Sequence, residues 1–212
     1  MDKIVFFNIA CMKKYQGLVG DVAVHGGDYV KQHGFGAEIF NFQHFRDKLY
    51  GFVEAGWKPP KCINITRLAA RRIDQSISDI LVIWVARQSY GGKTVVVGWY
   101  ENAKVYKARQ KPPAKSHRKQ RDRQDAPYFV EAEKENCLLI PQNMRSFQVL
   151  RAAELRAARI APEDLKHAGG IGQSNVYHAQ DWYGNQVKPR VLEYVAMWKR
   201  QKHLSVPITG YY

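Results

Sequence analysis

Aromatic residues and a strongly basic segment are neighbours in the middle of the chain. Trp84 and Trp99 each lie in a short apolar run rich in β-branched residues, which is typical of a strand. Trp99 and Tyr100 are consecutive, so their side chains are expected on opposite faces of a sheet. The segment 107–123 contains eight Lys or Arg residues. Because aromatic rings stack on bases and cations contact phosphates, this region predicts a nucleic-acid-binding site. Tryptophans that belong to a protein core are the alternative.

A second polar cluster lies between residues 169 and 185, where glycines and aromatic residues are interspersed with amides, a hydroxyl and a carboxylate. Amide and hydroxyl groups can donate hydrogen bonds to the edge of a base and accept them from it. The residues expected to contact a base here are Gln173, Ser174, Asn175 and Trp182. A hydrogen-bonded surface turn is the alternative interpretation.

Three carboxylates are candidates for acid or base chemistry: Asp28 in a glycine-rich stretch, Glu38 and Asp181. The sequence contains neither the GxSxG pattern of serine hydrolases nor the HExxH pattern of zinc proteases, and its histidines lack a recognised metal-site spacing. We therefore expect no metal ion and no cofactor. A base-excising enzyme needs only one placed carboxylate beside a flipped nucleotide, so enzymatic activity stays open.

The charge of the chain favours a polyanionic partner. Lys and Arg number 33 against 19 Asp and Glu, which gives a formal net charge of +14. The sequence shows no basic amphipathic helix of the kind that binds membrane surfaces, so we expect nucleic acid and no membrane. A generally basic composition without a specific site is the alternative. The residues expected to contact phosphates are Arg67, Arg71, Arg72, Lys107, Arg109, Lys111, Lys115, Arg118, Lys119, Arg121 and Arg123.

The N-terminal apolar run and the cysteines predict a cytoplasmic protein. The run within residues 3–10 is too short for a transmembrane helix and lacks the features of a signal peptide. Cys11, Cys62 and Cys137 are odd in number and widely spaced, so neither disulfides nor a zinc site is expected.

The first two thirds of the chain are expected to be rich in strands. Strands are predicted at residues 3–10, 37–42, 48–54, 80–87, 95–100, 104–107 and 128–141, the three between 80 and 107 forming an antiparallel meander. Residues 63–73 are expected to pass from a strand into a basic helix at Thr66, and residues 107–124 to form a mobile loop.

The last third is expected to be helical. Residues 147–160 are rich in Ala, Arg and Leu, and 161–164 resemble the start of a further helix. A last helix over 188–203 is expected to bury one face, formed by Val191, Tyr194, Val195 and Trp198. These elements predict a single compact α+β domain, with a β-rich part over 1–141 and a helical and loop part over 142–212.

The motifs LVIWVAR, from residue 81, and TVVVGWYENAKVYK, from residue 94, resemble the core of PUA-like domains, the superfamily that includes EVE, YTH, ASCH and SRA modules. The likeness covers residues 1–140 loosely and 80–107 more specifically. It implies a twisted antiparallel sheet or partly open β-barrel with flanking helices. The helical last third and the long basic loop exceed a minimal module of this kind.

The same resemblance implies a function. PUA-like domains typically draw one modified base into an aromatic-lined pocket, and prokaryotic members are often joined to restriction nucleases. Carried over to this sequence, the likeness nominates Trp84 and Trp99 as pocket walls, with Asn102 at the adjoining turn and Tyr100 beside them.

We therefore expect a protein of restriction or phage defence that binds duplex DNA. It would flip a modified base into a pocket between the meander and residues 172–182, with a nuclease as a further partner. Two alternatives stay open. One is an enzyme that excises or cleaves at a modified base through Asp28, Glu38 or Asp181. The other is an RNA-binding accessory protein.

Overall fold

The computed structural model describes residues 3–17, 19–24, 36–56, 59–89, 92–119, 124–162, 167–172 and 174–204. The strands are β1 (Ile4–Ile9), β2 (His44–Phe45), β3 (Lys48–Gly51), β4 (Ser76–Arg87), β5 (Thr94–Gln110), β6 (Tyr128–Glu133), β7 (Cys137–Leu139) and β8 (Val176–Tyr177). The helices are α2 (Ala152–Ala158) and α3 (Trp182–Leu204), with 3₁₀ turns η1 (Ala37–Phe40), η2 (Ile65–Leu68), η3 (Lys134–Asn136) and η4 (Gln142–Met144).

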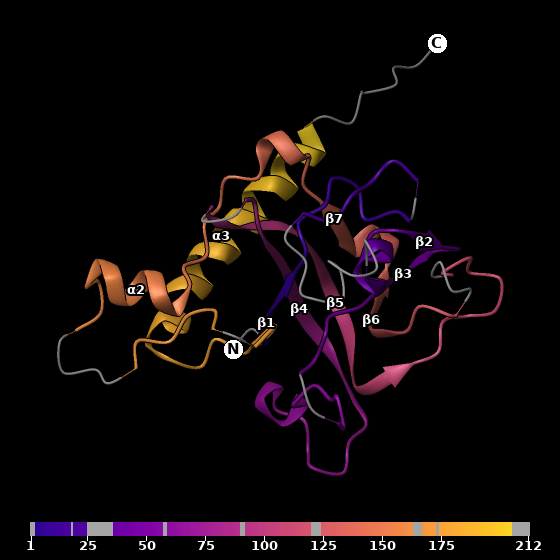
Figure 1. Cartoon of the computed structure of the whole chain (residues 1–212), viewed down its shortest axis with the longest axis horizontal. Helices are drawn as coiled ribbons and strands as arrows, with labels where there is room; N and C mark the ends of the chain where they lie inside the picture. The colour runs from indigo at the N-terminus through magenta and orange to yellow at the C-terminus, as the bar shows by residue number, and fades with distance from the viewer. Residues whose placement is uncertain are drawn as a thin grey trace.

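The strands form one open, mixed sheet, which gives the α+β fold class that the sequence predicts (Figure 1). The strand order is β2-β3-β6-β5-β4-β1-β8, and β7 pairs with β5. β1 and β4 run parallel, and the other pairs are antiparallel. The parallel pair is made by a long crossover that carries η1, β2, β3 and η2 between β1 and β4.

The expected three-stranded meander is instead a two-stranded hairpin of β4 and β5. β5 continues through Glu101 and Asn102, where the sequence predicts a turn. The register shifts there, from Ile80 opposite Ala103 to Val82 opposite Tyr100, and Asn102 takes a left-handed conformation with φ 49°. Such a bulge accommodates the extra residue and bends the strand without ending it.

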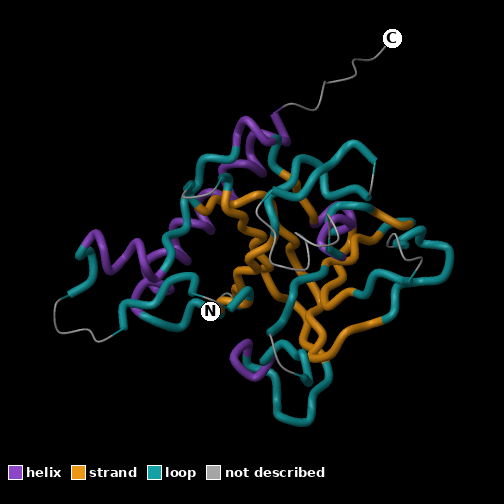
Figure 2. Tube along the Cα trace, viewed as in Figure 1, coloured by secondary structure: helices purple, strands orange, loops and turns teal. Residues whose placement is uncertain are grey.

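The alternation of side chains along this hairpin divides the interior into two cores. The rings of Trp84 and Tyr100 pack edge to face, with 5.2 Å between their centroids, in the core that also contains Phe7. Trp99 faces the other side of the sheet, as predicted, and belongs to the core that α3 covers. Figure 2 shows both α-helices on that side of the strands. The α3 residues that contribute to this core include the predicted face Val191, Tyr194, Val195 and Trp198.

Several predicted elements are wrong. Residues 37–40 form η1 rather than a strand, and the helix expected from Thr66 is only the short η2, which ends at Ala69 with φ 71°. Residues 147–149 pair with the start of β5, so α2 begins only at Ala152. The α3 helix begins at Trp182, before the predicted start.

Two further expectations are settled only in part. The expected strand over 128–141 is two strands, β6 and β7, with η3 between them. Of the helix start predicted at 161–164, residues 163 and 164 lie outside the described residues. No helix among the described residues is long and apolar enough to cross a membrane.

Gly51 on β3 lies where the core leaves no space for a larger side chain. A Cβ atom added there would overlap the buried Trp84 ring and touch Tyr100. We expect Gly51→Ala to lower the free energy of unfolding by about 1–3 kcal/mol, since overpacking a closed core costs this much. Gly172→Ala is the matched control, because a Cβ there meets open space and the change should stay within about 0.5 kcal/mol. Urea unfolding of both variants measures the difference, and equal stabilities would contradict the assignment.

Candidate functional site

A cavity of about 330 Å³ lies between η2 and the loop that carries β8. This volume is at the lower end of the range of small-molecule sites and suits a single small ring system. The lining residues are Arg67, Gly170, Gly172, Ser174, Val176, Tyr177, His178, Ala179, Gln180 and Asp181. The structure therefore places much of the predicted polar cluster around one cavity.

Asn175 holds the cavity loop against the sheet. Its backbone carbonyl accepts the Asn8 N–H at 2.8 Å, and its side-chain oxygen accepts a hydrogen bond from Asn8 Nδ2 at 3.1 Å. Its own Nδ2 donates to the carbonyl oxygen of Glu54 at 3.4 Å. Asn175 is not among the cavity-lining residues, so it supports the loop instead of contacting a base as predicted.

His178 forms a wall of the cavity and stays neutral near pH 7. Its Nε2 lies 2.9 Å from the carbonyl oxygen of Asn64, which can only accept, so Nε2 carries the proton. Burial lowers the pKa of His178 below its usual 6.5, and the nearby charge of Arg67 lowers it further. The Gln180 Nε2 also donates across the cavity, to the carbonyl oxygen of Arg67 at 2.6 Å.

Asp181, a candidate catalytic residue, caps the first turn of α3. Its Oδ1 accepts hydrogen bonds from the Tyr177 hydroxyl at 2.6 Å and from the Gly184 N–H at 2.8 Å. A carboxylate at this position accepts a hydrogen bond from a backbone amide of the first turn, and its negative charge interacts favourably with the positive end of the helix dipole. Trp182 is the first residue of α3 and packs against the core that α3 covers. It is not among the cavity-lining residues. Ser174 does line the cavity, and its hydroxyl bonds to the backbone of Val176.

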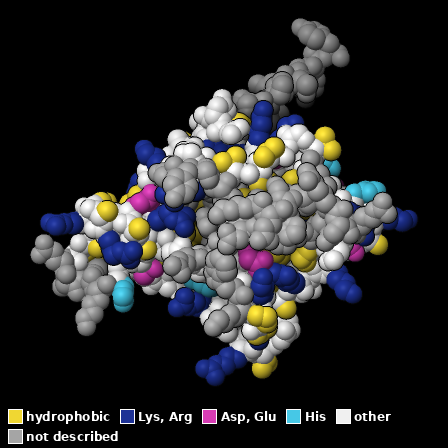
Figure 3. All heavy atoms as spheres, in the orientation of Figure 1, with side chains coloured by type: hydrophobic (Ala, Val, Ile, Leu, Met, Phe, Trp, Pro, Cys, Tyr) yellow, Lys and Arg dark blue, Asp and Glu magenta, His cyan; other side chains and the backbone are white. Residues whose placement is uncertain are grey.

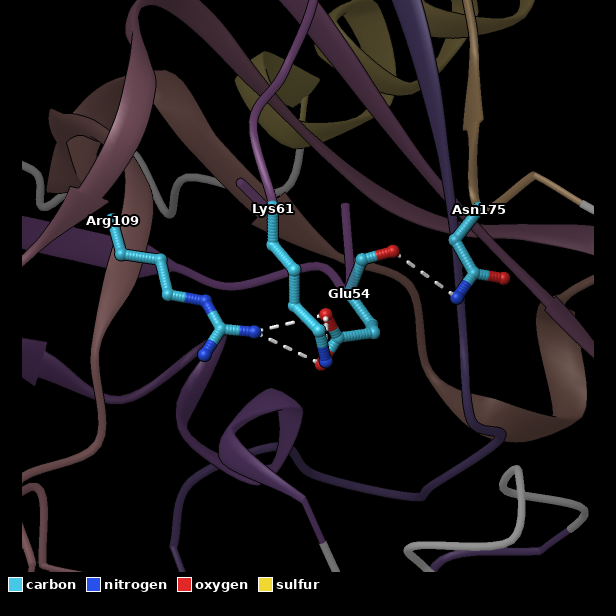
Figure 4. Close-up of polar contacts among 4 residues, drawn as sticks. All are labelled: Glu54, Lys61, Arg109 and Asn175. Atoms are coloured by element: carbon cyan, nitrogen blue, oxygen red, sulfur yellow. Dashed lines mark hydrogen bonds and ion pairs between the residues drawn. The ribbon is translucent and has the colours of Figure 1, made fainter. Parts of the chain in front are cut away.

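Beside this loop, one carboxylate is shared by two cations (Figure 4). Lys61 Nζ lies 3.2 Å from Glu54 Oε1, and Arg109 Nη2 donates to both Glu54 oxygens at 2.9 and 3.1 Å. All three side chains are partly exposed. The cluster therefore keeps a net positive charge next to the anchoring Asn175. Neither Glu54 nor Lys61 has a local sequence signal, because the contacts join residues far apart in the chain.

Two of the predicted basic segments meet at the end of β5. Lys107 accepts a hydrogen bond from the Ile63 N–H and donates one to the Gln75 carbonyl, each at 2.9 Å, so the turn that carries Arg67 and Arg72 lies alongside β5. Figure 3 shows Lys and Arg side chains spread around the viewed face. The predicted phosphate contacts that this end of β5 brings together are Arg67, Arg71, Arg72, Lys107, Arg109 and Lys111.

The rest of the basic segment is placed differently. Lys115 is exposed, and Lys119 forms an ion pair with Asp125. Arg71, in the first group, pairs with Asp74 at 3.1 Å. Arg121 and Arg123 lie outside the described residues.

Arg118 is a correction to the predicted phosphate contacts. Its side chain is 2% exposed, and Nη1 donates to the carbonyl oxygens of Phe40 and Tyr50 at 2.8 and 2.7 Å. Burial lowers the pKa of Arg118 to about 10, so the group stays charged at neutral pH. Arg118 anchors the basic segment to the core and is closed off from phosphates.

Trp84, Trp99 and Tyr100 are not pocket walls in this structure. Their exposed fractions are 0%, 1% and 0%, and Trp99 lies on the face of the sheet opposite to the other two. The rings were predicted to form one site, but consecutive strand positions place them in two closed cores. Asn102 is exposed at the bulge and does not line the cavity, and Gln173 lies outside the described residues.

Of the other catalytic candidates, Glu38 is buried beside the end of β1. Its Oε2 accepts the Ala10 N–H at 2.7 Å, and its carboxylate also bonds to the backbone of Glu54. Burial raises the pKa of Glu38 to about 7, and the charge of Glu54 adds to this shift. Asp28 lies outside the described residues. Within the described part of the chain, no group of three or more His, Cys, Asp or Glu residues could hold a metal ion.

Comparisons with known proteins gave no relative: no family model, no curated protein and no solved structure matches the chain.

Glu38 is expected to make stability depend on pH. A pKa raised from 4.5 to about 7 in the folded state means that the folded protein binds the proton more tightly than the unfolded chain does. This contribution is complete below pH 4.5 and is lost as the pH rises through 7. Replacing Glu38 with neutral Gln removes the dependence. From pH 5 to pH 8, we expect the wild type to lose about 2.5 kcal/mol relative to Glu38→Gln.

Urea unfolding across this pH range measures the loss. Glu135→Gln removes an exposed carboxylate by the same chemical change and should follow the wild type. Parallel pH profiles for the wild type and Glu38→Gln would show that the carboxyl group is not buried as described.

Proposed function

We propose that this protein binds DNA and holds one flipped-out, modified base in the cavity between Arg67 and residues 170–181. The observation that carries the proposal is the position of Arg67. This residue lines the cavity and also belongs to the basic turn that Lys107 fixes beside the end of β5. A nucleic-acid backbone that follows the basic residues would therefore bring its bases to the cavity.

The basic end supplies contacts for the backbone. Arg67 and Arg72 are exposed and take part in no ion pair among the described residues, and Lys107 and Lys111 continue the surface on β5 and beyond it. The Glu54 cluster adds one further net positive charge. Phosphate contacts of this kind give affinity without sequence preference and are weakened by salt.

The cavity supplies the contacts for one base. Flipping a nucleotide costs a few kcal/mol, which contacts in the cavity must offset. Polar groups of Ser174, His178 and Gln180 and the apolar Val176 surround the space, so both hydrogen bonds and apolar contact are available. In this proposal the protein acts as a reader of modified DNA in restriction or phage defence and works with a separate nuclease.

One observation favours a second candidate function, a base-excising enzyme. Asp181 is one of the residues that line the cavity, and its Oδ2 has no hydrogen-bond partner among the described residues. A carboxylate beside a flipped nucleotide is the minimum that such chemistry needs.

The test is binding and product analysis on matched duplexes that carry cytosine, methylcytosine, hydroxymethylcytosine or glucosylated hydroxymethylcytosine, followed by alkali treatment. Selective binding without breaks supports the reader, and alkali-labile breaks at one base support the excising enzyme. Equal, salt-sensitive binding to every duplex would contradict both. An RNA of equal length as competitor identifies an RNA-binding protein.

Arg67 is expected to contribute to both parts of the site. We expect Arg67→Ala to reduce the slope of log affinity against log salt by about 1 and to abolish the preference for the modified duplex, because one phosphate contact and one cavity wall are lost. Fluorescence anisotropy at several salt concentrations measures both quantities.

The matched control is Arg46→Ala, which removes the same charge from an exposed residue between β2 and β3, at the edge of the sheet opposite to β8. We expect the modified-base preference to survive in this variant. If Arg46→Ala and Arg67→Ala behave alike, the binding is a property of the net charge and the cavity has no part in it.

A further inference from the structure

The hydrogen bonds that shape the cavity also fix which polar groups remain for a ligand. For His178, the proton is on Nε2, because that nitrogen faces the carbonyl oxygen of Asn64. In a neutral imidazole the other nitrogen is an acceptor, and the lowered pKa keeps the ring neutral at pH 7. His178 therefore offers Nδ1 as an acceptor.

Gln180 is restricted in the same way. Its amide nitrogen donates to the carbonyl oxygen of Arg67 at 2.6 Å, which sets the orientation of the carboxamide. The group that remains is Oε1, a second acceptor. No hydrogen bond to this atom occurs among the described residues.

Asp181 provides the third acceptor. Its Oδ1 already receives the Tyr177 hydroxyl and the Gly184 N–H, while Oδ2 receives neither. The Tyr177 hydroxyl is also committed, since it donates to Asp181 and lies 3.3 Å from the Gly170 N–H that donates to it. Among the described lining residues, the cationic side chain is Arg67, which the proposed function assigns to the backbone.

We infer that the cavity selects a base with an exocyclic amino group, as in cytosine, adenine or guanine, and disfavours thymine and uracil. This inference rests on the proposed function and names the class of base that the same site takes. An amino group offers two donors to the free side-chain acceptors of His178, Gln180 and Asp181. Thymine and uracil would place two carbonyl oxygens against these acceptors, with a single N–H between the carbonyls.

The energetic difference follows from unmade hydrogen bonds. Acceptors of the protein and carbonyl oxygens of the base would both lose water without gaining donors, which is the most effective way to reject a ligand of similar shape. We expect at least a tenfold preference for amino-bearing bases, which corresponds to about 1.4 kcal/mol and lies within the range of about 1–3 kcal/mol for a well-paired base contact.

The experiment uses the full-length protein and one duplex sequence with a single variable nucleotide opposite an abasic site, so that no base pair has to be broken. The nucleotide is cytosine, adenine, guanine, thymine, uracil or a second abasic residue. Tighter binding of the three amino-bearing bases, by at least about tenfold over thymine and uracil, is the expected result.

Two other results are informative in different ways. If all five bases bind equally well, and better than the duplex with two abasic residues, a base site exists but the inference about its selectivity is overturned. If the duplex with two abasic residues binds as tightly as the others, no base enters the protein, and the proposed function and the inference both fail.

A variant pair tests the role of the acceptors themselves. Gln180→Met removes the Oε1 acceptor from an exposed position that the fold does not bury, so the preference for amino-bearing bases should fall several-fold. Gln142→Met makes the same change at an exposed residue of η4, outside this cavity, and should keep the preference. An unchanged preference in Gln180→Met would overturn the assignment of the acceptor wall.

Discussion

The β4–β5 ladder is the interaction on which the other parts of the structure depend. Its side chains alternate between two closed cores, so one hairpin contributes to the core on each face of the sheet, and α3 covers one of these cores. The bulge at Asn102 lets β5 continue to Gln110. Near this end of β5, the backbone of Lys107 bonds to Ile63 and Gln75, the two ends of the basic turn. The basic end and the cavity next to it are therefore consequences of the length of one strand.

Buried polar side chains stabilise the long connections between the strands. Arg145 donates to the carbonyl oxygens of Met12, Lys13 and Ile140, and Asn41 exchanges two hydrogen bonds with the backbone of Phe52. Glu38 does the same for the end of β1. Backbone groups of irregular segments need partners when they leave water, and here charged and amide side chains supply them.

The sequence predicted those features that have a local cause. β1, the apolar runs within β4 and β5 and the buried face of α3 follow from β-branched runs and from a 3.6-residue period, whereas the continuation of β5 through Asn102 was not predicted. The helix expected from Thr66 failed because Ala69 turns left-handed and η2 ends, and Arg118 was misassigned because its carbonyl partners lie about seventy residues away in the chain. For the same reason the loop of residues 170–181 was recognisable as polar, while its pairing with Arg67 was not.

The burial of Arg118 has an entropic consequence for the basic segment. A tethered point in the middle of a loop divides it into two shorter pieces, each with fewer accessible conformations than the whole. Lys115 and Lys119 are therefore held within a few residues of a fixed anchor. In the proposed binding to nucleic acid, much of the ordering of these residues would already have occurred during folding, so a larger share of each contact would appear as affinity.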